Sequence, residues 1–183
     1  MSDTGSSPFH VTPAPQLLES ARRGDRAALT AIHQLYARPA FNLAVRMLGD
    51  AMAAEDVVQE VFLRLAKQLG GYRGEAPFGA WLRRAVANTA VDELRRRRWI
   101  DSEMPIEDRL EPRGVGGLDE EGRDAWRLLE RLEPEARVVL VLHAIEGWTH
   151  AEMAMLFGRS ESYTKSILSR ALARLRREIG ALE

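Results

Sequence analysis

The chain of 183 residues contains no cysteine. Disulfides, thiol nucleophiles and thiolate metal sites are therefore excluded. Its four histidines are scattered, and none stands at metal-motif spacing from another histidine or a carboxylate. A phosphate-binding glycine loop and a nucleophile elbow are also missing from the sequence. We therefore expect no metal, no cofactor and no enzymatic activity, and we interpret the histidines as surface or capping residues.

Long apolar runs are missing as well. No stretch approaches the roughly 20 apolar residues that a helix needs to cross a bilayer. The first thirteen residues, MSDTGSSPFHVTP, lack the basic start and apolar run of a secretory signal. Their small and polar composition predicts a disordered arm over residues 1–13. Together with the absence of cysteine, these features favour a cytoplasmic protein without membrane insertion.

The sequence has no strong alternation of apolar and polar residues and no glycine-turn hairpin signal. Nearly every patterned segment has its apolar residues at helical spacing, so the predicted fold class is all-α. Residues 100–122 differ because they hold two prolines, four glycines and no sustained apolar stripe. We therefore predict two small helical domains, residues 14–99 and 123–183, joined by a flexible linker.

Charge is distributed unevenly along the chain, although the net charge is only −1. Residues 14–100 carry 14 basic and 9 acidic residues, and residues 123–183 carry 10 and 9. Residues 101–122 carry 2 basic and 8 acidic residues, so the linker is acidic between two modules that lean basic. The near-neutral total is therefore no argument against nucleic-acid binding.

The first domain contains a series of helix signals. Asp25 can cap a helix whose apolar positions continue to Tyr36, and Pro39 is expected to restart the chain. Gly49 and Asp50 then break the pattern. The longer segments that follow are a helix over about residues 51–69, a loop over 70–77 and a helix over about 78–99.

The strongest local pattern lies near the C-terminal end. Thr149 and Glu152 form a capping box that opens a short helix, and Gly158 can take the left-handed conformation of a tight turn. Ser160 caps the next helix, and the small Ala154 allows a close helix crossing. This pattern is typical of a helix-turn-helix, which places its second helix in the DNA major groove. Helices are predicted over about residues 123–132, 135–146, 150–157 and 161–180.

The last of these helices has two distinct faces. One is apolar and includes Ile167, Leu168 and Ala171. The other carries short hydroxyls and long cations, which suit contacts with base edges and phosphates. The alternative is a helical hairpin with a solvated basic face. The polar face consists of Ser162, Lys165, Ser166, Ser169 and Arg170, and Arg174 extends its positive surface.

An acidic face is predicted on the helix over residues 51–69. It lies opposite an apolar stripe, because residues three and four apart are neighbours on a helix. Such a face is a poor DNA surface, but it suits docking against a basic helix of a protein partner. The alternative is a solvated polar face. Its members are Glu55, Asp56, Gln59 and Glu60.

The segment after this helix combines aromatic, amide and cationic groups. Tyr72 beside Arg73 can hold single-stranded bases by stacking and charge. The amide of Asn88 can pair with an unpaired base edge, although local packing or exposure to water is the alternative. Trp81 is assigned to the core because it joins the apolar stripe. Four consecutive cations surround the end of the helix, where we expect phosphate contacts: Arg95, Arg96, Arg97 and Arg98.

These segments resemble the extracytoplasmic-function group of sigma factors in the sigma-70 family. AEDVVQEVFLRL resembles that family's polymerase-binding helix, and FGAWLRRAVANTAVDELRRRRW resembles its promoter-melting and minus-ten segment. LEPEARVVLVLHAIEGWTHAEMAMLFGRS resembles its minus-thirty-five domain. The resemblance covers about residues 16–99 and 123–180. It implies a protein that binds core RNA polymerase and directs promoter-specific transcription initiation.

The resemblance also implies roles for the candidate residues. The acidic face would contact the clamp of the polymerase β′ subunit. Tyr72, Arg73 and Asn88 would capture a flipped base of the nontemplate minus-ten strand. The acidic linker would thread polymerase channels, where negative charge imitates a phosphate chain, and an anti-sigma protein is a further expected partner. The residues implied in reading the minus-thirty-five element are Ser162, Tyr163, Lys165, Ser166, Ser169, Arg170 and Arg174.

Two features depart from the family pattern. Ser162, Tyr163 and Thr164 stand where Gly-Thr-Val is frequent, and Ile167 stands where arginine is frequent. These changes leave the fold intact but leave the preferred promoter sequence undefined. The rival hypothesis is a stand-alone helix-turn-helix regulator, which usually reads paired half-sites as a dimer. That hypothesis leaves the acidic face unexplained.

Overall fold

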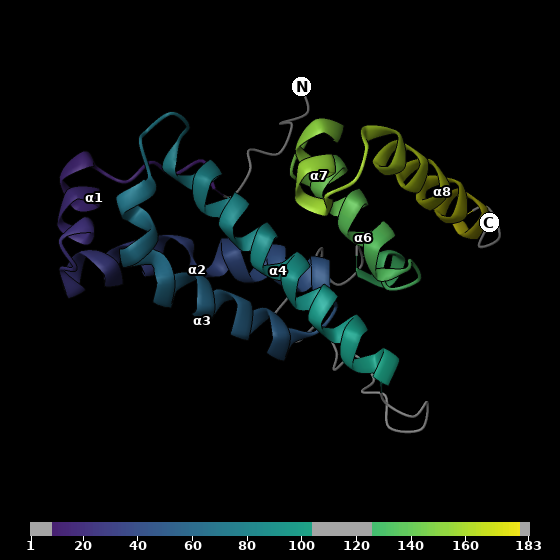
Figure 1. The fold of residues 1–183 in the computed structure, drawn as a ribbon, viewed down its shortest axis with the longest axis horizontal. Coiled ribbons are helices and arrows are strands. Elements are labelled where there is room, and N and C mark those ends of the chain that lie inside the picture. Colours follow the sequence, from purple (N-terminus) through teal and green to yellow (C-terminus); the bar gives the residue numbers. More distant parts are fainter. Residues whose placement is uncertain (1–8, 104–125, 180–183) are drawn as a thin grey trace. The chain divides into compact units, whose positions relative to one another are not determined.

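The computed structural model describes residues 9–103 and 126–179. The described residues form helices and connecting loops without a strand, which confirms the all-α prediction (Figure 1). The chain divides into two compact units, Met1–Ala44 with Met52–Glu93 and Val45–Ala51 with Leu94–Glu183. Most of the predicted acidic linker lies outside the described residues. The start of the helix predicted over 123–132 also lies outside them, and residues 126–129 of this segment are helical.

The first unit is built from α1 (Pro15–Arg22), α2 (Arg26–Leu48), α3 (Ala51–Gln68), the 3₁₀ turn η1 (Leu69–Gly71) and α4 (Phe78–Glu103), although the ends of α2 and α4 belong to the second unit. The cap predicted at Asp25 is confirmed, because its Oδ1 accepts a hydrogen bond from the amide of Ala28 at 2.9 Å. The predicted break after α2 is also confirmed, and Gly49 there has a φ of 74°.

Helix α2 continues through Pro39, so the predicted restart at this residue is wrong. Its buried face runs on both sides of the proline, from Ile32 and Tyr36 to Leu43 and Met47. A proline inside a helix costs about 3 kcal/mol. Burial of each large apolar side chain returns roughly 1.5–3 kcal/mol, so one continuous face outweighs the lost hydrogen bond.

Tyr36 is fully buried in the first unit. Its ring packs against Phe9 and Phe78, with centroid distances of 6.2 and 5.5 Å, and its hydroxyl donates to the carbonyl of Val11. Burial raises the pKa of Tyr36 to about 12. Phe9 and Pro13 are buried, so residues 9–13 are held to the unit by these two side chains and differ from the loose arm expected over 1–13. The remaining residues of that arm lie outside the described ranges.

The second unit contains α6 (Pro134–Leu140), the π turn η3 (Val141–Ile145), α7 (His150–Phe157) and α8 (Glu161–Ile179). Helix α8 packs against both α6 and α7. The helix predicted over residues 135–146 is present as α6 followed by η3. Its second half widens into a π turn, in which the Glu146 amide donates to the Val141 carbonyl. Hydrophobic periodicity gives no signal for such a widening.

Candidate functional site

The acidic face of α3 is exposed as predicted. Glu55, Asp56 and Gln59 are exposed, and Glu60 is half-buried. Glu60 pairs with Arg64 one turn later, with 2.7 Å between Oε1 and Nη2. The opposite face holds the buried side chains that fix the orientation of the helix, namely Val57, Val58, Val61 and Leu65. The face therefore presents the carboxylates of Glu55 and Asp56 and the amide of Gln59 to solvent.

Sequence reasoning missed two apolar side chains on this exposed side of α3. Leu63 is 74% exposed and Met52 is 54% exposed. Leu63 follows Gln59 by four residues, and Met52 precedes Asp56 by four, so both border the acidic face. A large apolar residue at a polar position of the helical repeat was the available signal.

The loop before α4 holds Tyr72 in a defined position. Its ring lies 5.5 Å from that of Phe78 and 5.6 Å from that of Trp81, and its hydroxyl donates to the Ala76 carbonyl at 2.8 Å. The guanidinium of Arg22 donates to the Tyr72 carbonyl. Trp81 is half-buried within this aromatic cluster, which agrees only in part with its assignment to the core. Arg73 and, on α4, Asn88 are exposed.

The four consecutive arginines lie near the end of α4 and belong to the second unit. Arg97 pairs with the buried Asp50 at 3.0 Å, and Arg95 donates to the carbonyl of Leu156 at 3.1 Å. Arg98 lies 3.4 Å from Glu135, and Arg96 is exposed. The guanidinium groups of Arg95, Arg97 and Arg98 therefore have intramolecular acceptors in this conformation as well as the charge that suits phosphate.

The turn between α7 and α8 is built as the sequence predicts. Thr149 accepts from the Glu152 amide, and the Glu152 carboxylate accepts from the Thr149 amide at 2.9 Å, which completes the capping box. Gly158 ends α7 with a φ of 62°. The hydroxyl of Ser160 accepts from the amide of Tyr163 at 3.2 Å and caps α8. These bonds fix a helix-turn-helix.

The predicted polar face of α8 is exposed along its whole length. Ile167, Leu168 and Ala171 are buried on the opposite side. Lys165 forms an exposed ion pair with Glu161 at 3.2 Å, which solvent screens and DNA phosphates can replace. The exposed residues are Ser162, Lys165, Ser166, Ser169, Arg170 and Arg174. One surface thus combines exposed hydroxyl groups with cations, the residue types that commonly contact base edges and phosphates.

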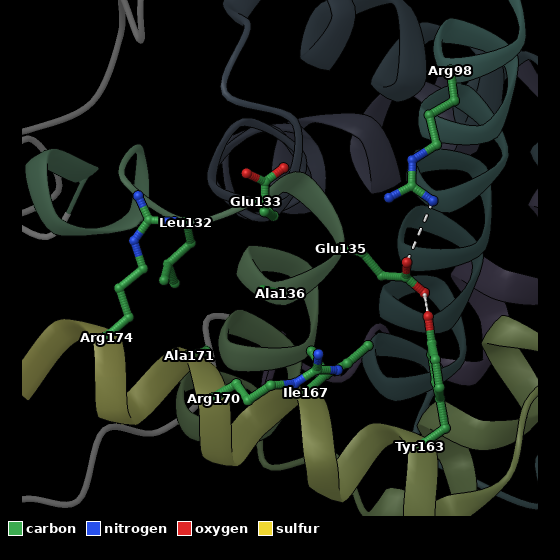
Figure 2. Close-up of a pocket in the computed structure, with 10 residues that line it drawn as sticks. All are labelled: Arg98, Leu132, Glu133, Glu135, Ala136, Tyr163, Ile167, Arg170, Ala171 and Arg174. Atoms are coloured by element: carbon green, nitrogen blue, oxygen red, sulfur yellow. Dashed lines mark hydrogen bonds and ion pairs between the residues drawn. The ribbon is translucent and has the colours of Figure 1, made fainter. Parts of the chain in front are cut away.

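Tyr163 is placed differently from the other candidates on α8. It is half-buried, and its hydroxyl donates to Oε1 of Glu135 at 2.9 Å (Figure 2). The two groups line a cavity of about 300 Å³, which Arg98, Ile167 and Arg170 also border (Figure 2). Burial and the bond to Glu135 raise the pKa of Tyr163. The phenol is therefore directed at a carboxylate rather than along the exposed face.

Two histidines that sequence reasoning left as surface or capping residues meet beside α8. The rings of His143 and His150 stack, with centroids 4.8 Å apart and planes inclined by 25°. His150 also lies 3.0 Å from the hydroxyl of the buried Thr164. No sequence signal marks this pair, because a loop between η3 and α7 separates the two residues and helical periodicity does not extend across it.

Within residues 9–103 and 126–179, no group of three or more histidine, aspartate or glutamate side chains could hold a metal ion. In the same ranges, no helix is both long and apolar enough to cross a bilayer.

Two family models match the chain in the order of its predicted domains. Sigma-70 region 2 matches residues 32–100, and Sigma-70 region 4 matches residues 123–175. The RNA polymerase sigma-H factor of Pseudomonas aeruginosa is 31% identical over 85% of this chain and 88% of the relative. The chain belongs to the extracytoplasmic-function sigma factors of the sigma-70 family.

Other sigma factors show similar coverage. CarQ of Myxococcus xanthus is 30% identical over 91% of this chain and 97% of the relative. The extracytoplasmic-function factor SigM of Mycobacterium tuberculosis is 30% identical over 94% of this chain and 88% of the relative. The structure of CnrH in complex with the cytosolic domain of CnrY matches with a TM-score of 0.56 and 26% identity, covering 91% of this chain and 96% of that one.

This sigma factor therefore binds core RNA polymerase and directs promoter-specific initiation, and the stand-alone regulator hypothesis loses its support. Sigma factors as a class are non-catalytic initiation factors. The structure of RpoE with the anti-sigma factor NepR from Bartonella quintana, at 24% identity and a TM-score of 0.58, agrees in fold over 82% of this chain and 96% of that one.

Proposed function

We propose that this sigma factor divides promoter recognition between two modules. Residues 14–99 dock on the clamp of the polymerase β′ subunit and hold the opened minus-ten strand, and residues 123–183 read the minus-thirty-five duplex. The observation that carries this division is the contrast between the acidic exposed face of α3 and the hydroxyl-rich basic face of α8. The acidic face of α3 repels DNA, and the basic face of α8 attracts it. The two faces therefore suit two different partners.

Docking rests on the acidic face of α3. Glu55, Asp56 and Gln59 are exposed, and Glu60 stands beside them. Their complement is a basic helix of the polymerase clamp, which the carboxylates attract at long range and orient at contact. The buried valines of α3 anchor the helix, so the face approaches its partner without rearrangement.

Strand capture rests on Tyr72, Arg73 and Asn88. Unstacking one base costs a few kcal/mol. Aromatic stacking returns roughly 1–3 kcal/mol per base, so a site that accepts only the unstacked base stabilises the open strand without ATP. The exposed Asn88 amide offers both a donor and an acceptor to a base edge. Phosphates of the same strand would contact Arg95, Arg96, Arg97 and Arg98, and would replace the intramolecular acceptors of Arg95, Arg97 and Arg98.

Duplex reading rests on α8. Lys165 and Arg170 supply positive charge, and Ser166 and Ser169 supply hydroxyls that donate to or accept from base edges. Ser162 and Arg174 extend the contact at the two ends of the face. The phenol of Tyr163 is bonded to Glu135 in this structure. Tyr163 joins the DNA-facing surface once this bond opens, for example when a DNA phosphate replaces the carboxylate.

Three further properties complete the proposal. The acidic linker occupies a nucleic-acid channel of the polymerase, although its residues lie mostly outside the described ranges. The similar protein CnrH was solved with a protein partner, the cytosolic domain of CnrY, and we propose that this chain also binds a protein partner, an anti-sigma factor. We place the protein in the cytoplasm, where the polymerase works, and assign it no covalent catalysis, because binding alone accounts for its action.

Run-off transcription with purified core polymerase and genomic DNA tests the proposal. Wild-type protein should start RNA chains at defined points. Glu55→Gln with Asp56→Asn should weaken assembly with core polymerase about ten-fold, since each lost charge contact contributes roughly 0.7 kcal/mol. Lys165→Met with Arg170→Met should leave assembly unchanged and lower selective initiation.

The control is Arg176→Met with Arg177→Met, which removes two exposed charges farther along α8. If both double variants lowered assembly alike, or if the protein bound duplex tightly without polymerase, the division of labour would be wrong.

A further inference from the structure

A chain of hydrogen bonds connects α7 to the first turn of α8. The hydroxyl of Thr164, which is fully buried, has one proton and donates it to the Glu161 carbonyl at 2.9 Å. The same hydroxyl must therefore accept from Nδ1 of His150, which lies 3.0 Å away. His150 thus carries a proton on Nδ1 and holds the first residue of α7 to α8.

His143 braces this bond from the π turn. Its Nδ1 lies 2.8 Å from the Trp148 carbonyl, which only accepts, so this nitrogen is protonated as well. Its ring stacks on that of His150 at 4.8 Å. Three consecutive elements, η3, α7 and α8, are therefore connected through two imidazole rings and one buried hydroxyl.

The bond lies beside the residues that face DNA in the proposed function. Thr164 immediately precedes Lys165 and Ser166, both exposed. A helix turns by about 100° per residue, so a buried Thr164 directs these two side chains outward. If the bond from α7 were lost, α8 could shift against α7 and displace these side chains from the positions at which they would meet base edges.

Charge around His150 makes the connection sensitive to protons. The groups that face it are His143 from η3 and Lys165 and Glu161 from α8. Burial is the largest cause that lowers the pKa of His150 below its ordinary 6.5, followed by His143 and Lys165, while Glu161 opposes them. A second proton adds to Nε2 and leaves the Nδ1 donor in place, so its effect on the connection comes from repulsion between the imidazolium and Lys165.

We propose that His150 is a positioning residue for promoter reading, which sets the register of α8 through Thr164 and loosens it on gaining a second proton. The proposal rests on the proposed role of α8 in reading duplex DNA. The pKa of His150 is lower in the folded state than its ordinary 6.5, so the unfolded chain takes up the second proton first as the pH falls. The stabilisation that the neutral ring provides is therefore present above pH 6.5 and is lost as the pH falls below it.

The test uses full-length protein assembled with core polymerase. Two DNA templates are compared. One is a genomic fragment from which the wild-type holoenzyme starts run-off transcription, and the other is the same fragment with its upstream element scrambled. His150→Phe keeps a stacking ring without a donor, and Thr164→Val removes the acceptor. Each should lower the ratio of run-off from the two fragments about 5–10-fold, and the double variant should lose no more than either single variant.

His150→Asn is the conservative rescue, because its amide nitrogen occupies the place of Nδ1. It should keep the ratio within about two-fold of wild type. The ratio for wild type should fall between pH 7.5 and pH 5.5, whereas His150→Asn should show a flatter profile. His33→Asn, in the first unit, should keep the wild-type profile. Circular dichroism of each variant separates loss of fold from loss of register.

The outcomes separate the inference from the proposed function. Absence of wild-type run-off at defined points overturns the proposed function itself. Wild-type activity together with unchanged selection by folded His150→Phe and Thr164→Val overturns the inference alone. If His150→Asn had the same pH profile as wild type, the claim that protonation of His150 loosens α8 would be overturned.

Discussion

At the scale of single residues, glycine determines where two segments approach each other. Gly79 lies on α4 beside the backbone of Phe9, and a Cβ at this position would stand 1.8 Å from the Phe9 carbonyl oxygen. Only a residue without a side chain permits this approach. The close contact explains why residues 9–13 pack on the first unit although their composition resembles that of a loose arm.

We therefore expect Gly79→Ala to destabilise the first unit by about 1–3 kcal/mol, the usual cost of overpacking. Chemical denaturation followed by circular dichroism measures this difference. Gly70→Ala is the matched control, since its Cβ would meet no atom within 4 Å and its φ is not positive. Equal stability of the two variants would contradict the packing of Phe9 against α4.

At the scale of elements, the capping box of α7 is the clearest case of a local signal that determines local structure. Thr149 and Glu152 exchange hydrogen bonds as their spacing predicts. Thr149→Ala should cost about 1 kcal/mol in the free energy of unfolding, measured by denaturant titration. Thr149→Ser keeps the accepting oxygen and should stay within a few tenths of a kcal/mol, so equal losses in both would contradict the cap.

Local signals of this kind made much of the fold predictable. The caps at Asp25 and Ser160 and the turn at Gly158 depend on residues within one helical turn, and all three are present. The exposed face of α8 followed from helical periodicity alone. The continuation of α2 through Pro39 could not be predicted from local signals, because the burial that compensates for the proline depends on residues that are distant in the sequence.

The same distinction applies to the candidate site. The polar face of α8 is a property of one helix, whereas the environment of Tyr163 depends on Glu135, which lies 28 residues away in the sequence. The stacking of His143 on His150 likewise requires the path of the chain between η3 and α7. Pairs that are distant in sequence leave no periodic trace, so their partners were missing from the prediction.

At the scale of the whole molecule, assembly with polymerase should combine charge with apolar contact. Leu63 borders the acidic face of α3 and is 74% exposed. Its burial on docking would contribute up to roughly 1.5–3 kcal/mol, and salt screens this contribution much less than that of the carboxylates. We therefore expect Leu63 to become buried when the factor docks on polymerase.

Leu63→Ser should weaken binding to core polymerase about ten-fold or more at both low and high salt. Variants of Glu55 and Asp56 should instead lose most of their effect as salt increases. Titration of labelled sigma factor with core polymerase measures both. Leu35→Ser on α2, which is 40% exposed, is the control and should bind as wild type does. Unchanged binding of Leu63→Ser would place this residue outside the interface.

The proline within α2 has a consequence for the local dynamics of that helix. Pro39 has no amide proton, so it cannot donate to the carbonyl of Leu35 as the helical ladder would require. Water can reach this carbonyl, because Leu35 lies on an exposed part of the helix. In deuterium exchange, the amides of this turn should open earlier than those around Leu43. A long helix thus has a built-in weak turn while its buried side remains intact.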